Sequence, residues 1–270
     1  MNQPPNQAGD ARADRPARPR PSQTPAQARG HAQASGPNRP AGQPPDRRPA
    51  TIGSLAELLD RARALVAATP PGRPAVIGVS GEPGAGKSTL AEHLETRLGA
   101  ELGAVRVPLD GFHLSDAVLA ALGRGDRKGA MDTFDGWGYA ALLARLRAGA
   151  GHTVYAPGFE RSLEQPLAGA IAVAPGTRLV ITEGNYLLAP DPPWPEARRL
   201  IDEVWHVELD PASRRRRLVE RHIRFGKTPA EAAAWVDRVD GANAAQVAAW
   251  RLSADWLVGI GQLDLPRGRD

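Results

Sequence analysis

The sequence predicts an α/β fold in which a mostly parallel β-sheet is covered by helices on both faces. Apolar segments with strand character lie at residues 75–80, 104–109, 178–182 and 203–209. The stretches between them are long enough to contain helices, and several have helical periodicity. Parallel strands need crossover connections, which are usually helices, so this alternation indicates a parallel sheet. We therefore expect one three-layer α/β/α domain.

The helices are predicted from caps and periodicity. Ser54 and Glu57 form a capping-box pattern that opens a helix to about residue 68. Further helices are expected, in chain order, over 88–98, over 115–122, over 139–147, from Ala212, and over 229–258 with an interruption near Gly241. Residues 152–157 are expected to be a short extended segment before a loop that carries Phe159, Glu160 and Arg161.

The first fifty residues differ in composition from the rest. They contain eleven Pro and no Val, Ile, Leu, Phe, Trp or Tyr, so they cannot bury enough apolar surface to offset chain entropy. They carry eight Arg against three Asp, a net charge of +5, whereas residues 51–270 carry 26 basic and 27 acidic side chains, a net charge of −1. We predict a disordered Pro/Arg-rich tail over 1–50 and a single folded domain over 51–270. The near-neutral domain argues against a nucleic-acid partner, with the basic tail as a weak exception.

The composition excludes several classes of protein. Cysteine is absent, which rules out disulfides, thiolate catalysis and cysteine metal sites. No apolar run approaches the length of a membrane span, and no apolar segment of the signal-peptide type follows Met1. We expect a cytoplasmic protein with no membrane partner.

Residues 81–88 match G-x-x-x-x-G-K-[ST], the phosphate-binding P-loop, between a predicted strand and a predicted helix. Glycines let the backbone curl around an anion, so that N–H groups and the helix N-terminus point at phosphates. Lys87 would reach the β- and γ-phosphates, and the Ser88 hydroxyl would bind Mg²⁺. The motif therefore predicts binding of ATP with Mg²⁺. The residues expected to hold the phosphates are Gly81, Glu82, Pro83, Gly84, Ala85, Gly86, Lys87, Ser88 and Thr89.

Two carboxylates follow predicted strands, at the sheet edge where open α/β folds bind their ligands. A carboxylate in that place can accept a hydroxyl proton or hold a metal-bound water. Asp110 is explained equally well as a turn residue before Gly111. Glu183 ends a hydrophobic strand downstream of the P-loop, which favours a role as a second Mg²⁺ ligand.

An arginine stripe is predicted on the helix that begins near Ala212. Arg214, Arg217, Arg221 and Arg224 follow an i, i+3, i+7, i+10 spacing and share one face. The stripe could be a solvated face or a nucleic-acid patch. In a chain with a P-loop it favours a lid, with Arg214 and Arg221 on the nucleotide and Arg217 at the transferred phosphoryl group.

Together these elements resemble the phosphoribulokinase/uridine kinase family of P-loop kinases, to which type I pantothenate kinases are related, over about residues 75–254. The most specific part is similar to the pattern D-G-F-H…R-K-G…[ST]-[YF]-D at residues 110–135, and residues 181–188 are similar to the family's E-G segment. The resemblance implies that Asp110 is the general base. It also implies an acceptor pocket lined by His113, Lys128, Tyr155 and Arg161, while Asn243 either faces the substrate or caps a helix.

The resemblance implies an ATP-dependent phosphotransferase that acts on an alcohol group of a small metabolite. A nucleoside is the expected acceptor, with pantothenate or a fructose-type sugar as the alternative. Phe159-Glu160 stands where the family usually has Tyr-Asp or Phe-Asp, which weakens pantothenate more than it weakens a kinase. Relatives are often dimeric or tetrameric, so a homodimer is expected.

Three functions of other classes stay open. A regulatory GTPase is disfavoured because no Asn is followed by Lys, so the guanine-recognition motif is missing. A nucleic-acid-dependent ATPase would use the basic tail and the arginine stripe. A binding module that has lost activity is disfavoured by the presence of Lys87, Asp110 and Glu183.

Overall fold

The computed structural model describes residues 48–263 and 265. Except for residues 48–50, the predicted disordered tail lies outside the described residues. Within this part of the chain, no helix is long and apolar enough to cross a membrane.

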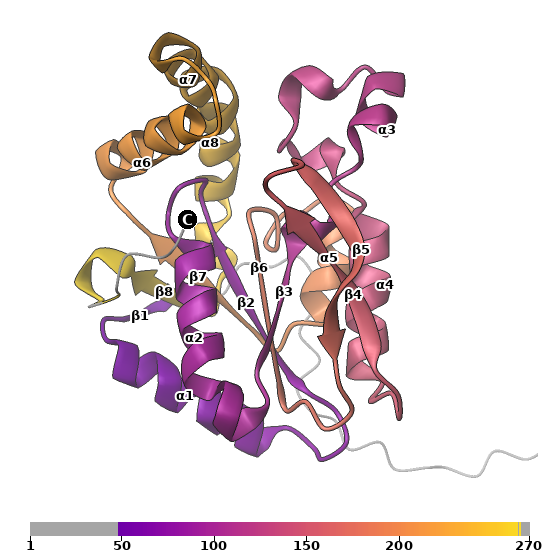
Figure 1. The fold of residues 1–270 in the computed structure, drawn as a ribbon. Helices are drawn as coiled ribbons and strands as arrows, with labels where there is room; N and C mark the ends of the chain where they lie inside the picture. The colour runs from indigo at the N-terminus through magenta and orange to yellow at the C-terminus, as the bar shows by residue number, and fades with distance from the viewer. Residues whose placement is uncertain (1–47, 264, 266–270) are drawn as a thin grey trace, which may run out of the picture. The chain divides into compact units, whose positions relative to one another are not determined.

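A six-stranded sheet, in which every strand pairs in parallel with its neighbours, forms the centre of the fold (Figure 1). Its strands are, in spatial order, β1 (Ala50–Ile52), β8 (Trp256–Gly259), β7 (Glu203–Glu208), β2 (Ala75–Gly81), β6 (Leu179–Gly184) and β3 (Val105–Pro108). Val79 of β2 and Pro108 of β3 both pair with Glu183 of β6. The carboxyl ends of β2, β3 and β6 therefore meet at one edge of the sheet.

Helices cover both faces of this sheet, which confirms the predicted three-layer α/β/α fold (Figure 1). One face packs against α1 (Leu55–Ala68) and α2 (Lys87–Leu102), and the other against α4 (Gly136–Arg147) and α5 (Trp194–Arg199). Successive residues of β2 belong to opposite clusters: Val76 packs on the α4 and α5 side, and Ile77 on the α1 and α2 side. A strand buried on both faces reads as a continuous apolar run, and the sequence 75–79 does so.

The helix cap predicted at Ser54 is present, and two further helices have caps that were not predicted. The Ser54 hydroxyl accepts the Glu57 N–H at 3.2 Å and begins α1. Ser115 caps α3 (Asp116–Ala121) in the same way. Asp135 accepts the Gly138 N–H at 2.8 Å, so α4 begins three residues before the predicted start at residue 139.

The segment predicted as a short extended piece and a loop is in fact a β-hairpin. β4 (Val154–Glu160) pairs antiparallel with β5 (Gln165–Val173), with a register shift between Ala156 and Gly158. Pro157 has no N–H for the ladder, and Gly and Ala are weak strand formers, so neither strand has a clear sequence signature. The hairpin affects the site because β4 packs beside the turn that carries Asp110.

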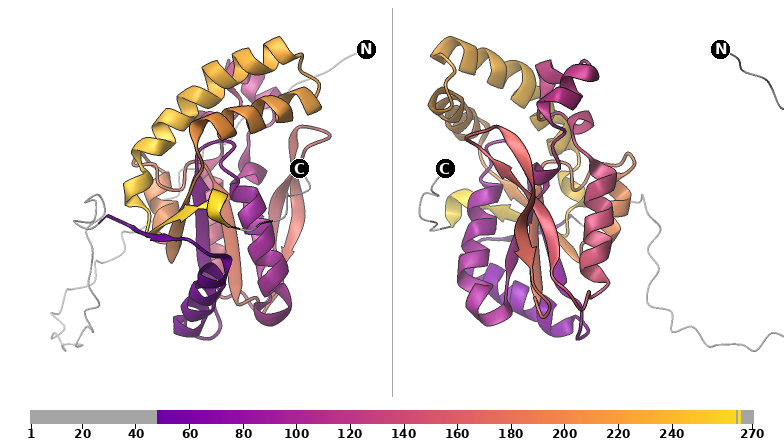
Figure 2. Two further views of the ribbon diagram at one scale, coloured as in Figure 1. Left: turned by 90° about the vertical axis from the view of Figure 1, so that its left-hand side faces the viewer. Right: turned by 45° about the vertical axis from the view of Figure 1, so that its right-hand side comes forward.

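The C-terminal region differs from the prediction in two places. α7 (Pro229–Trp235) and α8 (Gly241–Ala249) are joined by the π-helical turn Val236–Asp240, so Gly241 does not interrupt the helix. Residues 256–259, predicted as helical up to 258, form β8 between β1 and β7. Figure 2 shows α6 (Pro211–Arg224), α7 and α8 gathered beyond the carboxyl edge of the sheet.

Gly111 lies where the backbone of β4 crosses the turn after β3. A Cβ atom on Gly111 would lie 2.4 Å from the Pro157 carbonyl oxygen and 3.2 Å from the Gly158 nitrogen. The glycine after Asp110 is therefore required by the close approach of the hairpin.

We expect Gly111→Ala to destabilise the protein by about 1–3 kcal/mol, because the added methyl group must displace the backbone of β4. The measurement is the free energy of unfolding from denaturant titration. Gly151→Ala is the matched control, because its Cβ would contact nothing within 4 Å. Equal stability of the two variants would contradict the close packing of the hairpin on this turn.

Candidate active site

Two glycines of the P-loop are required both by conformation and by close packing. Gly84 and Gly86 have left-handed φ values of 76° and 98°. A Cβ on Gly84 would lie 2.8 Å from Leu218 Cγ of α6, and one on Gly86 would lie 2.7 Å from Ile260 Cδ1. The loop can therefore curl only with glycine in these places, while α6 packs directly on it.

Lys87 begins α2 and is held inside the loop. Its side chain is 8% exposed, and its Nζ donates to the Glu82 carbonyl oxygen at 3.1 Å. Burial lowers the pKa of Lys87, and the charges of Glu183 and Asp110 oppose this effect. The ammonium group is thus removed from water at a place where a phosphate would supply a strong partner.

Ser88 and Glu183 form a hydrogen-bonded pair of oxygen groups at the base of the loop. Ser88 Oγ donates to Glu183 Oε1 at 3.1 Å, and Glu183 is only 4% exposed. Burial, and next the charge of Asp110, raise the pKa of Glu183. Hard oxygen donors suit Mg²⁺, which keeps several waters and binds few protein groups. Within residues 48–263 and 265 no cluster of three or more His, Asp or Glu could hold a metal, so Mg²⁺ would need the phosphates as further ligands.

Asp110 lies in the 3-10 turn Leu109–Phe112, directly after β3. Its carbonyl oxygen accepts the His113 Nδ1–H at 2.9 Å, and its carboxylate lies 3.8 Å from Arg161 Nη2. His113 packs on Phe134 with ring centroids 4.0 Å apart, and burial lowers its pKa. The imidazole is therefore neutral, with a lone pair on Nε2.

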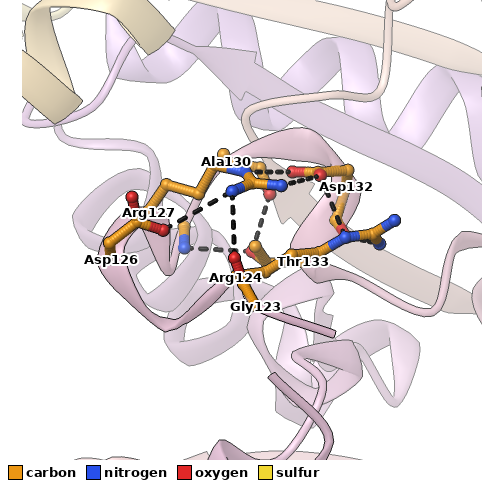
Figure 3. Close-up of polar contacts among 8 residues, drawn as sticks. Gly123, Arg124, Asp126, Arg127, Ala130, Asp132 and Thr133 are labelled. Carbon is orange, nitrogen blue, oxygen red and sulfur yellow. Dashed lines mark hydrogen bonds and ion pairs between the residues drawn. The ribbon is translucent and has the colours of Figure 1, made fainter. Parts of the chain in front are cut away.

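A network of arginine and aspartate residues fixes the loop that follows α3 (Figure 3). Arg127 Nη2 donates to Asp132 at 2.9 Å, and Arg124 donates to the Asp132 carbonyl oxygen at 2.7 Å. The Thr133 hydroxyl accepts the Gly129 N–H at 3.0 Å. Arg127, part of the R-K-G pattern, thus stabilises the conformation of the loop.

The same loop presents Lys128 to the acceptor side. Lys128 Nζ donates to Asp116 Oδ1 at 2.7 Å and to the Glu164 carbonyl oxygen in the hairpin turn. It also lies over the Phe159 ring, 5.8 Å from the centroid, and the Arg161 guanidinium lies 6.0 Å from the same centroid. The loop and the hairpin are joined through this side chain.

The arginine stripe of α6 faces the P-loop. Arg214 Nη1 donates to the Pro83 carbonyl oxygen at 3.4 Å, and Arg217 Nη1 lies 3.5 Å from the point that a Cβ on Gly86 would occupy. Arg221 lies in the pocket wall. Arg215 is not part of this stripe and pairs with Asp237 at 2.8 Å.

Most of the predicted site residues line one pocket of about 420 Å³. They are Pro83, Gly84, Lys87, Ser88, Asp110, His113, Lys128, Arg161, Glu183, Arg221 and Asn243. Asn243 lies inside α8 and caps no helix; its amide donates to the Gly129 carbonyl oxygen at 3.3 Å. The other predicted nucleotide-binding residues shape the loop or its contact with α6 without entering the pocket wall; they are Gly81, Glu82, Ala85, Gly86, Thr89, Arg214 and Arg217.

Tyr155 is not brought to this pocket, and the expectation that it lines the acceptor site was wrong. Its side chain is 61% exposed, whereas its neighbours Val154 and Ala156 are buried in the core. Successive side chains of a strand point to opposite faces, so a buried Val154 and Ala156 turn Tyr155 outward.

Sequence reasoning missed several residues of the pocket wall. Phe134 and Phe159 both pack against His113, with centroid distances of 4.0 and 5.1 Å. His222 Nε2 lies 2.9 Å from Asp240 Oδ2, and both residues line the pocket with Trp235. Asp240 lies three residues before Asn243, so helical spacing was the signal that could have indicated it.

Comparison with known proteins finds relatives among kinases. The Zeta toxin family matches residues 60–114. An "ATP-dependent kinase-like protein" of Aspergillus versicolor is 42% identical over 133 residues, which are 47% of this chain and 77% of the relative. A "Putative uridine kinase" of Schizosaccharomyces pombe is 35% identical over 181 residues, which are 62% of this chain and 75% of the relative. A crystal structure of a "putative fructose transport system kinase" from Silicibacter sp. TM1040 has a TM-score of 0.69 and 38% identity, and covers 75% of this chain and 98% of its own.

We expect Lys87→Met to lose most MgATP affinity, by at least about tenfold, because a methionine cannot pair with the phosphates. Without nucleotide its unfolding free energy should be equal or higher, since burial disfavours the ammonium in the folded state. Calorimetric titration and denaturant unfolding measure the two effects, with Arg199→Ala, a surface change on α5, as control. Binding of MgATP at wild-type strength by Lys87→Met would remove Lys87 from the phosphate site.

The raised pKa of Glu183 predicts a pH dependence of Mg²⁺ binding. A carboxylate with a raised pKa takes up its proton above the range near 4.3 in which an ordinary Glu titrates, and metal binding needs the deprotonated form. The Mg²⁺ affinity of the ATP-loaded protein should therefore fall as the pH is lowered, and the fall should begin above the pH range in which an ordinary Glu titrates. Glu183→Gln isolates the effect from the titration of ATP itself. If the Mg²⁺ affinities of the wild-type protein and of Glu183→Gln change with pH in the same way, Glu183 is not a Mg²⁺ ligand.

Proposed function

Because the chain belongs to the phosphoribulokinase/uridine kinase family of P-loop kinases, we propose that it transfers the γ-phosphoryl group of ATP to a hydroxyl group of a small metabolite. The observation that carries this proposal is the single pocket shared by Lys87, by the Ser88–Glu183 pair and by Asp110. A nucleotide site alone would need only the first three residues. Asp110, with His113 and Arg161, gives the same pocket a second side that can hold an acceptor.

In the proposed reaction, Asp110 accepts the proton of the acceptor hydroxyl as the oxygen attacks the γ-phosphorus atom. A new O–P bond forms, the bond between the γ-phosphorus and the bridging oxygen of ATP breaks, and ADP leaves. A second hydroxyl group of the acceptor can donate to the lone pair on His113 Nε2. Arg161 lies close enough to Asp110 to hold its carboxylate in place.

Lys87 and the lid arginines stabilise the charge that spreads over the phosphoryl oxygens during transfer. Arg217 lies over Gly86, and Arg221 lies in the pocket wall, so both guanidinium groups face the nucleotide side. When bound by Ser88, Glu183 and the phosphates, Mg²⁺ supplies further positive charge there. Such stabilisation is effective because Lys87 and Glu183 are buried, which strengthens electrostatic interactions at the base of the pocket.

A nucleoside is the acceptor that we favour, and pantothenate or a sugar is the alternative. The relative from Schizosaccharomyces pombe that bears the name of a uridine kinase supports the first. Phe134, Phe159 and His113 provide apolar ring surface on the acceptor side of the pocket, which suits a base or a sugar face.

The test is ADP release from MgATP by the purified protein, with nucleosides, pantothenate or simple sugars as acceptors and with a no-acceptor control. We expect one class to raise turnover well above the control. A protein that hydrolyses ATP equally with every acceptor, and faster with added RNA, would instead be a nucleic-acid-dependent ATPase.

Asp110→Asn should bind MgATP with wild-type affinity and lose at least about 100-fold in kcat, because the amide cannot accept the hydroxyl proton. Steady-state kinetics with the identified acceptor measure this, and Asp60→Asn, an exposed change on α1, is the control. Near-normal turnover would leave Asp110 as a turn residue only.

A further inference from the structure

A buried polar chain runs behind the P-loop and takes no part in the proposed transfer. Ser80 on β2 and His206 on β7 pair across the sheet, and both side chains are fully buried. Ser80 Oγ lies 2.8 Å from His206 Nδ1. When the hydroxyl donates to Nδ1, the imidazole proton lies on Nε2.

Nε2 of His206 points toward the P-loop. It lies 3.7 Å from Glu82 Oε2, and the Glu82 side chain is 14% exposed. Burial alone would raise the pKa of Glu82. The contact with His206, next the backbone N–H of Glu82 itself, and then the charges of His206 and Arg214 outweigh this effect and lower the pKa. The charge of Arg214, the first arginine of the lid helix, thus also reaches Glu82.

Arg214 completes the chain on the side of α6. Its Nη1 donates to the carbonyl oxygen of Pro83, the residue after Glu82. Within the described residues, Glu82 Oε2, His206 Nε2 and Arg214 Nε are buried and have no hydrogen-bond partner. Buried polar atoms are rarely left unpaired, so their presence together needs an explanation.

We propose that Glu82 and His206 are positioning residues that hold Arg214 and, through it, set the place of α6 on the P-loop. Arg217 and Arg221 follow Arg214 on the same helical face, so fixing Arg214 fixes both guanidinium groups relative to the phosphates. The inference rests on the proposed function only in taking the γ-phosphate as the group that α6 faces.

The distances suit a chain that tightens when the nucleotide is bound. A closure of about 0.7 Å would bring His206 Nε2 within hydrogen-bond range of Glu82 Oε2. The Glu82 carboxylate would then be fixed by this hydrogen bond and could attract the Arg214 guanidinium. None of Ser80, Glu82, His206 and Arg214 lies in the pocket wall.

The test compares two substitutions that each keep one of the two hydrogen-bonding positions of the imidazole. His206→Gln places an amide N–H near the position of Nε2, whereas His206→Asn keeps only the contact with Ser80. The readout is the affinity for the Mg²⁺ complex of a non-hydrolysable ATP analogue, compared with the affinity for MgADP. Neither measurement needs an acceptor. We expect His206→Asn to lose about tenfold in affinity for the analogue and less than about twofold for MgADP, and His206→Gln to stay near wild type.

A double-mutant cycle with Arg214→Ala tests whether the effect passes through the lid. Arg214→Ala should weaken binding of the analogue, and His206→Asn or Glu82→Gln should add nothing in that background. Additive losses, or equal losses for both nucleotides that follow a fall in thermal stability, would overturn the inference in favour of a structural role. A wild-type protein that binds neither nucleotide would instead overturn the proposed function, so the two failures are distinguishable.

Discussion

The parallel register of β2, β6 and β3 is the constraint on which the rest of the site depends. It sets Val79 and Pro108 opposite Glu183, so the P-loop, Glu183 and the turn of Asp110 begin at the same edge of the sheet. A shift of one residue would turn every side chain of a strand to the other face. The apolar residues of β2 and β6, buried on both sides, hold this register.

Burial shifts the pKa values of the two charged side chains at the P-loop. Lys87 and Glu183 are both largely removed from water, which lowers the pKa of the first and raises the pKa of the second. Each charged form is therefore disfavoured until a phosphate or a metal ion arrives. A bound phosphate would supply a charged partner for Lys87, and a bound metal ion would supply one for Glu183. Leu218 packs on Gly84 and holds α6, which carries the lid arginines, against the P-loop.

Local motifs explain what the sequence could predict. The P-loop and Glu183 were singled out because each is a short pattern at a strand end, and the cap at Ser54 needs only neighbouring residues. Asp110 was chosen over a plain turn residue only through the family resemblance. The hairpin was missed because its pairing joins segments that contain Pro157 and Gly158 and have little strand propensity of their own. Tyr155 was misplaced for the same reason, since its direction depends on that pairing. The Ser80–His206 contact joins residues 126 positions apart, and only the register of β2 with β7 brings them together.

The central claim is that one pocket holds ATP and the acceptor together, so that the phosphoryl group passes directly between them. The stereochemical course of transfer from ATP that is chiral at the γ-phosphorus tests this claim most directly. Direct in-line transfer predicts inversion of configuration at phosphorus in the product. Retention would require an intermediate carrier of the phosphoryl group and would contradict the account.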